Sequence, residues 1–442
     1  MTDIHTSSQQ PTAPESILGH EAQRATEQAV LHLLRDPDVL ALQDSLKAEI
    51  ASWPRGQSGT GAERIDQAVL QWTAALIGDE LSYARRASPS FVLGTDTTPR
   101  RWLGHTFPGT GKAADNPDAI YRSTVLDGRG RYEVTGQIDL AYPIIQILFS
   151  ISAGTMTHPA EVKQVEGAAP NPDAGIFTIL GNLSEDELNI APDGTFKITI
   201  GGEPTGDNHL PTEPVPCSFG CRQMLLDWKT TPLRLTIRRL DTVSRNSLEM
   251  AALKQAVLAD LGDYVRFWAK FGGVWLGGVK TNDVAPPTVR EGGWGFIGGV
   301  NFKLAPGEAA LITIHPGAAK YVALQVTDPW MVGPDNGRRQ SCLNLAQSTP
   351  DADGRYTYVI SPVDPGVANW LDSCGMDEGF GIMRWQGFPG GASDNSGLFH
   401  DFRIAGLSEV AELAGVARIT PQLRSKQLAA RRDSYFNRFS AA

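Results

Sequence analysis

One short stretch of the sequence gathers most of the side chains that could do chemistry. Asn369, Asp372, Glu378 and Arg384 place an amide, two carboxylates and a guanidinium close together along the chain. A carboxylate beside an arginine can act as a general base or orient a substrate, because burial and the neighbouring cation set its pKa. We predict that Asp372 or Glu378 is the base and that Arg384 holds an oxyanion. The alternative is structural, with the amide capping a loop and the arginine pairing two strands through a carboxylate.

Tryptophans near this stretch could form the wall of a ligand pocket. Trp370 and Trp385 lie close to its polar residues, and Trp330 precedes them. Aromatic side chains at the mouth of a cavity suit a flat or apolar molecule. The residues that we predict to bind substrate are Asn369, Trp370, Trp385, Trp330, Asn208 and Arg222.

Parts of this region occur a second time, about 160 residues earlier. The later copy begins D-G-R-Y-T-Y-V-I at Asp353, and the earlier copy begins D-G-T-F-K-I-T-I at Asp193. With one extra residue in the later loop, Asn208 aligns with Asn369, and Arg222 and Arg384 then sit in corresponding downstream strands. A second echo lies upstream, where Tyr142 and Gln146 match Tyr321 and Gln325. Recurrence at a fixed period is typical of repeated architecture, so we predict a duplicated β module. Two independent uses of the same turn chemistry are the alternative, and duplication itself favours a structural role for the repeated residues.

The spacing of apolar residues predicts which elements position these side chains. Residues 196–200 alternate between apolar and polar side chains, as half-buried strands do. Residues 65–76 repeat apolar side chains at helical spacing. We therefore predict a mainly β chain with flanking helices (α+β), built from two jelly-roll or β-sandwich modules. The predicted units are a disordered tail (1–16), a helical N-terminal region (17–87), a first β module (88–243), a helical insert and linker (244–285), a second β module (286–405) and a C-terminal helical tail (406–442).

Prolines mark two predicted boundaries. Asp36-Pro37 interrupts the helical pattern of residues 17–53, and Pro286-Pro287 predicts a linker ahead of the second β module. Proline lacks a backbone N–H and fixes its own φ, so it favours turns and the first turn of a helix.

The predicted C-terminal helix is strongly basic. Its cationic residues are Arg424, Lys426, Arg431, Arg432 and Arg438. A charge run of this kind is typical of a solvated face, which is our prediction. The alternative is a contact with an acidic surface of another subunit, in which case this helix would join a homo-oligomer.

Composition bounds the partners and the compartment. The chain has 442 residues, 41% of them hydrophobic, and a net charge of −10, which together are typical of a globular protein. This charge argues against a nucleic-acid partner, which requires a concentrated basic field. The N-terminus lacks the basic and apolar segments of a signal peptide, and no run of about 18 apolar residues predicts a membrane span. We expect a cytoplasmic protein with a small-molecule ligand.

Motifs of known cofactor and metal chemistry are missing or incomplete. The segment P-G-T-G-K at 108–112 resembles a phosphate loop but lacks its first glycine and its final Ser or Thr. The G-x-S-x-G and H-E-x-x-H patterns do not occur. Glu203, Asp207, Asn208 and His209 share one loop, and three of them could bind a metal, with His209 the best ligand and solvated side chains as the alternative. We predict no metal and no cofactor.

Several motifs resemble those of an uncharacterised bacterial family. They are N-P-D-x-x-Y-R at 116–122, D-G-R-G-R-Y at 127–132, N-x-L-P at 208–211, R-Q-x-x-x-D-W at 222–228, L-A-P-G-E-A at 304–309, L-Q-V-T-D-P-W at 324–330, D-A-D-G-R-Y at 351–356, D-P-G-V-A-N-W-L-D at 364–372 and R-W-Q at 384–386. This pattern is similar to bacterial proteins that pair two domain-of-unknown-function modules, the later one known as the DUF-twelve-fourteen family. The resemblance covers roughly residues 88–439. It implies β-rich, jelly-roll-like modules and no established activity. A histidine common in that family after N-W-L-D is replaced here by Met376.

The leading functional hypothesis is a cofactor-independent enzyme of hydrolase or lyase type. It would act on a hydrophobic or polyol-like small molecule through carboxylate acid–base chemistry. The alternatives are a non-catalytic module that binds carbohydrate or lipid, and a structural oligomer. An enzyme predicts a closed cleft with at least one perturbed pKa, whereas a binding module predicts an open aromatic platform.

Overall fold

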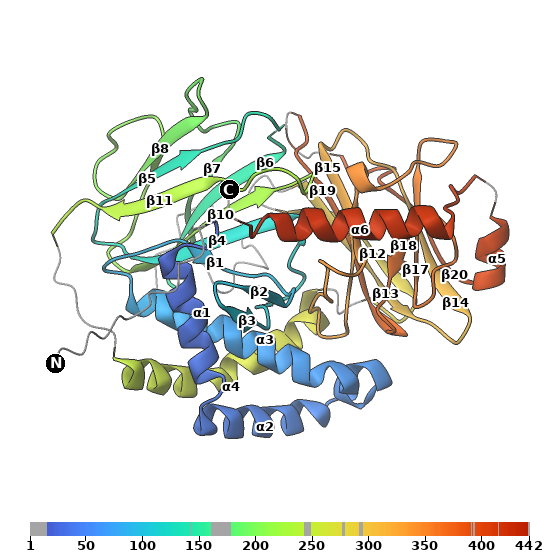
Figure 1. Ribbon diagram of the computed structural model, residues 1–442, viewed down its shortest axis with the longest axis horizontal. Coiled ribbons are helices and arrows are strands. Elements are labelled where there is room, and N and C mark those ends of the chain that lie inside the picture. The colour runs from blue at the N-terminus through green and yellow to red at the C-terminus, as the bar shows by residue number, and fades with distance from the viewer. Residues whose placement is uncertain are drawn as a thin grey trace, which may run out of the picture.

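The structure is a computed structural model that describes residues 16–142, 144–160, 178–242, 249–275, 279–290, 295–389, 391, 394–413 and 415–440. Two β-sandwiches lie side by side, and four helices gather below them in the view of Figure 1. The predicted mainly β fold with flanking helices is confirmed. Of the predicted disordered tail, residues 1–15 lie outside the described residues.

The first sandwich pairs a five-stranded sheet with a four-stranded sheet. The larger sheet has the order β1 (Val92–Leu93), β4 (Ala119–Asp127), β10 (Pro216–Met224), β6 (Gln146–Ala153) and β7 (Thr178–Ser184). The smaller sheet has the order β11 (Arg234–Arg239), β5 (Tyr132–Gln137), β8 (Thr195–Ile200) and β9 (His209–Leu210). Alternation along β8 turns Phe196, Ile198 and Ile200 into the core, where they meet the larger sheet.

The second sandwich has the same two-sheet form. Its larger sheet has the order β12 (Asp283–Arg290), β13 (Gly295–Lys303), β19 (Glu378–Gln386), β15 (Tyr321–Thr327) and β16 (Cys342–Asn344). Its smaller sheet has the order β18 (Trp370–Asp372), β17 (Tyr356–Ser361), β14 (Glu308–Ile314) and β20 (Phe399–Gly406). Every residue of β15 is buried, because the core of the second sandwich covers one of its faces and residues of the first sandwich, such as Met224, cover the other.

The strand orders of the two sandwiches correspond one to one. In each, the shortest strand of the smaller sheet runs parallel to its neighbour, with Ile200 beside Leu210 and Ile360 beside Leu371. All other strand pairs of the described residues are antiparallel except isolated bridges. A shared order is what duplication predicts, and descent from one copied module stays a prediction.

Four helices form one layer against the sandwiches: α1 (Glu21–Leu33), α2 (Pro37–Ala51), α3 (Gly59–Ala84) and α4 (Met250–Trp275). The break predicted at Asp36-Pro37 separates α1 from α2. The Asp36 side chain accepts hydrogen bonds from the first turn of α2, and Pro37 occupies a first-turn position that needs no N–H partner. The remaining elements are η1 (Pro54–Gln57), β2 (Arg100–Trp102), β3 (His105–Phe107), η2 (Leu345–Gln347), α5 (Leu407–Glu412) and α6 (Pro421–Asn437).

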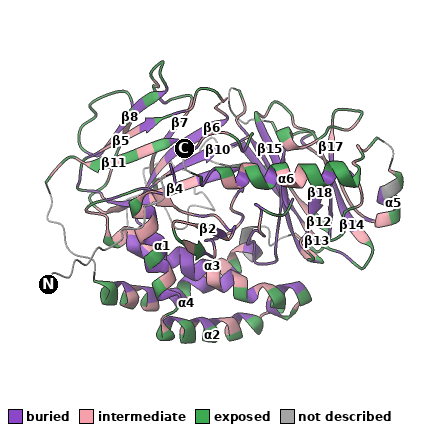
Figure 2. Cartoon of the chain, in the orientation of Figure 1, coloured by how far each residue is buried: buried purple, intermediate pink, exposed green. Residues whose placement is uncertain are grey.

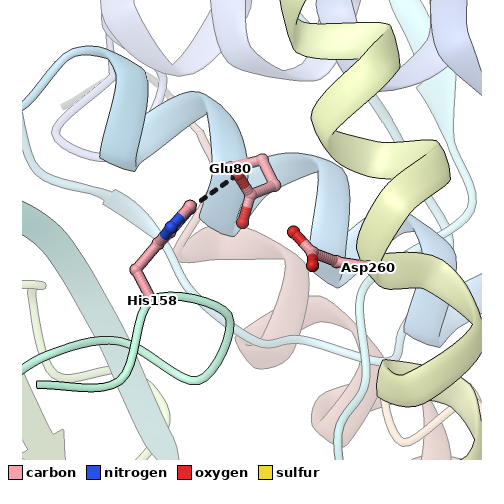
Figure 3. A group of neighbouring side chains, drawn as sticks. All are labelled: Glu80, His158 and Asp260. Carbon is pink, nitrogen blue, oxygen red and sulfur yellow. Dashed lines mark hydrogen bonds and ion pairs between the residues drawn. The ribbon is translucent and has the colours of Figure 1, made fainter.

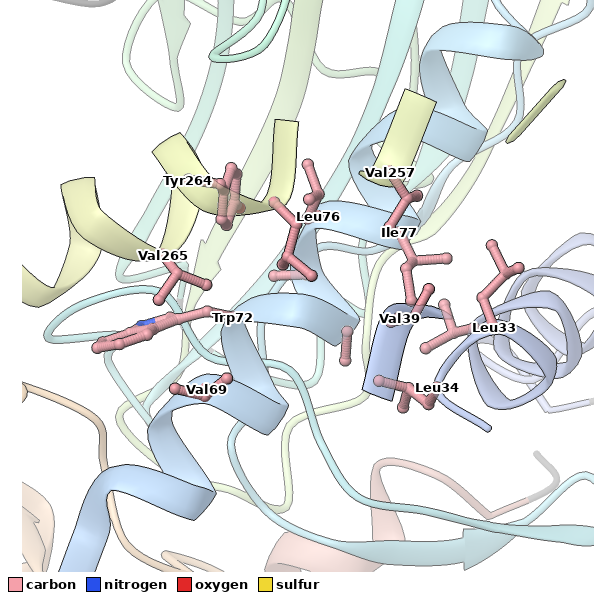
Figure 4. Packing of buried hydrophobic residues seen from close by; sticks show 14 of the residues in the cluster. Leu33, Leu34, Val39, Val69, Trp72, Leu76, Ile77, Val257, Tyr264 and Val265 are labelled. Atoms are coloured by element: carbon pink, nitrogen blue, oxygen red, sulfur yellow. The ribbon is translucent and has the colours of Figure 1, made fainter. Parts of the chain in front are cut away.

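Helix α3 is the centre of the helical layer. Its residues Trp72, Leu76 and Ile77 are fully buried and pack against α4 and against the turn between α1 and α2 (Figure 4). Buried residues dominate the middle of α3 (Figure 2). The apolar spacing that predicts this helix therefore also identifies its packed face. A helix that could span a membrane is absent from the part of the chain that the structure describes.

Helix α6 lies across both sandwiches (Figure 1), and the prediction of a solvated basic face is wrong for three of its arginines. Arg424 pairs with Asp364 at 2.9 Å, Arg431 stacks over Trp228 at 4.0 Å, and Arg438 donates to the backbone of residue 117. Lys426 and Arg432 are exposed, as expected. The buried arginines face this chain's own aromatic and carboxylate groups, so they are unavailable to a partner subunit.

The prediction of a linker at Pro286-Pro287 is also wrong, since both prolines lie within β12. Strand β12 is at the edge of its sheet, and its register shifts between Ala285 and Thr288. An edge strand with a bulge tolerates residues that cannot donate a ladder hydrogen bond. Prolines here mark a sheet edge rather than a connection.

Candidate functional site

Asn208 and Asn369 hold corresponding loops in the two sandwiches. In each, the side-chain oxygen accepts a backbone N–H, and the side-chain nitrogen donates to two backbone carbonyls. Asn369 accepts from the N–H of Thr349 at 2.8 Å and donates to the carbonyls of Thr349 at 2.7 Å and Thr357 at 3.3 Å. Asn208 accepts from the N–H of Asn189 at 2.8 Å and donates to the carbonyls of Asn189 and Lys197, both at 2.9 Å. Both amides are buried, and their contacts go to the main chain. Both amides support the fold. Asn208 also lines an open groove over the smaller sheet of the first sandwich, and a contact of either amide with substrate stays a prediction.

Arg222 and Arg384 also occupy corresponding places. Arg222 donates to the side-chain oxygen of Gln146 at 2.7 Å, and Arg384 donates to that of Gln325 at 2.8 Å. Each pair joins two neighbouring strands of the larger sheet. Arg384 also donates to the backbone oxygen of Ala114. Both arginines are buried, so Arg384 binds an amide and a carbonyl where an oxyanion is predicted.

The two predicted bases lie in separate environments. Asp372 accepts the N–H of Cys374 at 2.7 Å and pairs with Arg339 at 3.1 Å. Burial raises the pKa of Asp372, and these two partners oppose the rise. Glu378 pairs with Lys303 at 3.2 Å. Among the described hydrogen bonds and ion pairs, none joins the two carboxylates to each other or to the predicted oxyanion-binding arginine. Their catalytic role stays a prediction.

Trp330, Trp370 and Trp385 are buried in three different cores. Trp330 belongs to the helical layer and donates to the backbone oxygen of Gly61 at 2.8 Å. Trp385 fills the second sandwich, and Trp370 packs with Val410 of α5. The predicted wall of tryptophans is therefore not formed, because each indole fills its own core.

A cavity with charged and apolar walls lies elsewhere, between α1, α3 and the larger sheet of the first sandwich. Its volume is about 220 Å³, which is room for a small organic molecule. We name it the helix–sheet cavity. Its apolar lining includes Val30, Ala75, Phe107, Met156 and Trp268, and its charged lining is Glu27, Asp79, Arg100 and Lys112. Mostly apolar cavities with a few convergent polar groups are the usual form of a small-molecule site.

Glu27 is a buried carboxylate on the inner face of α1. Its first oxygen accepts from Gln23 at 3.1 Å and from Arg100 at 2.7 Å. Its second oxygen lies 2.8 Å from the indole nitrogen of Trp102 and 2.7 Å from Nε2 of His105. Burial alone would raise the pKa of Glu27, but the hydrogen bond with His105 and the charge of Arg100 outweigh it and leave the pKa below its ordinary value. Glu27 is thus held as a carboxylate that orients its neighbours.

Arg100 carries hydrogen-bond donors that the described residues do not satisfy. Its Nη2 reaches Glu27, but Nε and Nη1 have no hydrogen-bond partner among the described residues. Nη1 lies 3.9 Å from Asp96, and the guanidinium lies over the rings of Trp102 and Phe107 at 5.1 and 4.9 Å. The side chain is 2% exposed. Buried donors without an acceptor are destabilising, so an oxygen atom in the cavity would stabilise this arrangement.

Asp79 presents a second carboxylate on the opposite wall. It pairs with Lys112 at 2.9 Å and accepts from the hydroxyl of Tyr264 at 3.0 Å. Burial and the charge of Asp79 raise the pKa of Tyr264 well above its ordinary value, so this phenol remains a donor. Asp79 and Lys112 are each about a quarter exposed, which leaves them accessible to a bound molecule.

Gly78 leaves open space beside this carboxylate. A Cβ added at Gly78 would meet no atom within 4 Å, although the residue lies in the interior of α3 and lines the cavity. A glycine inside a helix costs about 1 kcal/mol relative to alanine. The chain accepts this cost at a position where the missing side chain keeps the cavity open.

The chain has the fold of an uncharacterized protein from Burkholderia cenocepacia. That crystal structure matches with a TM-score of 0.68 at 22% sequence identity, over 88% of this chain and 100% of that one. A protein from Vibrio parahaemolyticus matches with a TM-score of 0.37 at 13% identity, over 77% of this chain and 99% of that one. No protein-family model and no curated protein matches the chain. The shared fold assigns no activity, so the site is argued from its own geometry.

A larger groove runs over the smaller sheet of the first sandwich, with a volume of about 860 Å³. It is lined mainly by threonines and by charged residues, two of which, Glu133 and Lys197, pair with each other at 3.5 Å. Its one aromatic lining residue is Phe196, which is 5% exposed. The open aromatic platform expected of a carbohydrate-binding module is therefore absent from this groove.

The sequence did carry a signal for one of the charged cavity residues. Glu27 is three residues before Val30, so it places a carboxylate on the buried face of α1. Buried carboxylates need partners and are frequent at functional sites. Arg100 gives no such signal, since its strand β2 is only three residues long.

Proposed function

We propose that the protein binds a small molecule through a carbonyl or carboxylate oxygen in the helix–sheet cavity and acts on it by carboxylate acid–base chemistry. The observation that carries this proposal is the pair of unsatisfied N–H donors on Arg100 at the cavity wall. A charge-assisted hydrogen bond from a guanidinium to an oxygen is among the stronger polar contacts available to a ligand. The apolar lining suits the rest of the molecule.

Asp79 is the acid–base group in this proposal. Its carboxylate faces the cavity, and the hydroxyl of Tyr264 fixes its orientation while Lys112 supplies a cation beside it. Hydrolysis and elimination both require a group that takes up a proton from the bound molecule or from water. Glu27 already has four partners, so its role is to orient Arg100.

Profiling of cell metabolites with the purified protein tests this proposal. The wild-type protein is expected to retain or consume at least one small carbonyl or carboxylate compound. The variant Gly78→Leu should fill the cavity without displacing neighbouring atoms, because the space beside Gly78 is open. The matched control is Gly59→Leu, at an exposed glycine on the same helix whose added Cβ also meets no atom within 4 Å.

Loss of the retained or consumed compound in Gly78→Leu, but not in Gly59→Leu, is the expected result. The variant Asp79→Asn should bind the compound and fail to convert it. Equal behaviour of all three variants and the wild type would overturn the proposal. Conversion of the compound by Asp79→Asn but not by Asp372→Asn would assign the acid–base role to Asp372 in the second sandwich.

A further inference from the structure

Three side chains from distant elements converge beside the helix–sheet cavity. Glu80 belongs to α3, His158 to the loop after β6, and Asp260 to α4 (Figure 3). One possible ligand atom from each lies within 4.8 Å of those of the other two. In the described part of the chain, no other three His, Cys, Asp or Glu residues meet in this way. Their chain neighbours Asp79 and Met156 line the cavity.

The two carboxylates of this cluster lack the cations that such groups require. Glu80 is 2% exposed and has the imidazole of His158 at 3.0 Å. Asp260 is half-buried and forms no hydrogen bond or ion pair with a described residue. Like charges this close repel each other, and a divalent cation between them would relieve the repulsion.

Neighbouring groups hold the cluster in one orientation. The ring of Tyr83 stacks on His158 with centroids 3.5 Å apart and planes 13° apart. The hydroxyl of Thr157 donates to one oxygen of Glu80, so that the other oxygen faces the imidazole. The hydroxyl of Thr155 accepts the backbone N–H of His158 at 3.0 Å. Outer groups that fix the orientation of imidazole and carboxylate ligands are a regular feature of metal sites.

We propose that Glu80, His158 and Asp260 form a binding site for a divalent transition-metal ion, with Zn²⁺ the preferred ion. One imidazole nitrogen and two carboxylate oxygens suit Zn²⁺ or Mn²⁺, whereas Mg²⁺ and Ca²⁺ prefer oxygen ligands alone. Three protein ligands leave a coordination position for water or for a ligand oxygen. Metal–ligand bonds of about 2.1 Å require the three side chains to draw closer, which the partly exposed His158 and Asp260 can do.

The site stands on residues other than those that carry the proposed function. The tests are correspondingly separate, because the metal ion alone is the probe. If the cavity binds no small molecule, the proposed metal site is unaffected. If the protein binds no metal ion, the proposed function is unaffected.

Calorimetric titration of the chelator-treated protein with Zn²⁺ and with Mn²⁺ tests the site. One Zn²⁺ is expected to bind per chain, more tightly than Mn²⁺, following the usual order of divalent affinities. The variants His158→Gln and Asp260→Asn should each weaken Zn²⁺ binding by more than about tenfold, since even outer-shell changes at metal sites cost that much. The absorption spectrum of bound Co²⁺ gives a second readout that reports the ligands directly.

Two controls separate this site from other acidic groups. Asp263 lies on α4, the helix that carries Asp260, and its side chain is 97% exposed. Asp263→Asn should therefore bind Zn²⁺ like the wild type. His209→Gln changes the loop that the sequence suggests as a metal site, and it should also bind normally. Undiminished binding in both His158→Gln and Asp260→Asn, or no Zn²⁺ binding by the wild type, would overturn the proposal. Should His158→Gln fail to fold, Asp260→Asn decides whether the site binds Zn²⁺.

Discussion

The two sandwiches share a strand order and paired buried contacts, but they differ in what packs against their larger sheets. Against the second sandwich, Ala114, Met331 and Phe271 form an apolar contact with Ile297 and Ile382 of the sheet. Against the first, the helices leave a cavity with two carboxylates and two cations in its wall. The residues that recur in both sandwiches stabilise the fold, whereas the candidate chemistry lies with residues that do not recur. Under the proposed function, the repeated residues have a structural role and the site lies outside them.

The largest expected effect on stability comes from removing either of the side-chain amides that hold the loops, those of Asn208 and Asn369. Asn369→Ala and Asn208→Ala should each lower the free energy of unfolding by about 3–4 kcal/mol, because each leaves buried backbone groups unpaired. Chemical unfolding followed by circular dichroism measures this. Asp207→Ala, at an exposed neighbour of Asn208, is the control and should have little effect. A large loss of stability in one of the two asparagine variants and none in the other would contradict the correspondence between the sandwiches.

Removing the guanidinium of either Arg–Gln pair should have the next largest effect. Arg384→Met and Arg222→Met should each cost about 2–3 kcal/mol, because the buried carbonyl of Gln325 or Gln146 loses its donor. Replacing both partners of the second pair, as Arg384→Met with Gln325→Leu, should restore part of the loss. A loss in the double variant equal to the sum of the two single losses would show that the pair does not interact.

A buried carboxyl directly after β15 of the second sandwich makes the stability of the protein depend on pH. Asp328 is buried and accepts the N–H groups of Trp330 and Val332 at 2.8 and 2.9 Å, and burial raises its pKa to about 7. Its folded pKa exceeds its unfolded value, so the folded state holds the proton longer, and stability falls as pH rises from about 4 to about 7. Asp328→Asn should remove this fall in the free energy of unfolding between about pH 4 and about pH 7. A slope unchanged in the variant would contradict this assignment.

The smallest expected effect is a gain in stability rather than a loss. Gly78→Ala should stabilise the protein by about 0.5–1 kcal/mol, because alanine favours the helix and its Cβ meets open space. The rise in thermal midpoint measures this effect. Gly59→Ala, at the first residue of α3, is the matched control and should stabilise less. Destabilisation by Gly78→Ala would mean that the space beside it is filled by the packed protein.

The part of the fold set by local patterns could be predicted from the sequence. Turn and strand chemistry is local, so the alignment of Asn208 with Asn369, including one extra loop residue, matches their equivalent contacts. The break at Asp36-Pro37 was also predictable, because capping depends on adjacent residues. The edge strand β12 was not, since prolines suit loops and sheet edges alike.

The candidate site could not be predicted in the same way. The residues of the cavity and of the proposed metal site come from elements far apart in the chain, as Glu80 and His158 of the metal site show with a separation of 78 residues. No fixed spacing connects them, and only the tertiary packing of α3 brings them together. The burial of the arginines of α6 could not be predicted for the same reason, because burial against aromatic rings depends on distant partners.

The central claim is that the chemistry of this chain lies where its two halves differ. A crystal structure of the protein with the compound that it retains or consumes tests this most directly. The compound is expected in the helix–sheet cavity, with an oxygen at Nε or Nη1 of Arg100 and a polar group beside Asp79. A compound seated in the second sandwich against Asp372 or Glu378, with the helix–sheet cavity empty, would contradict the claim.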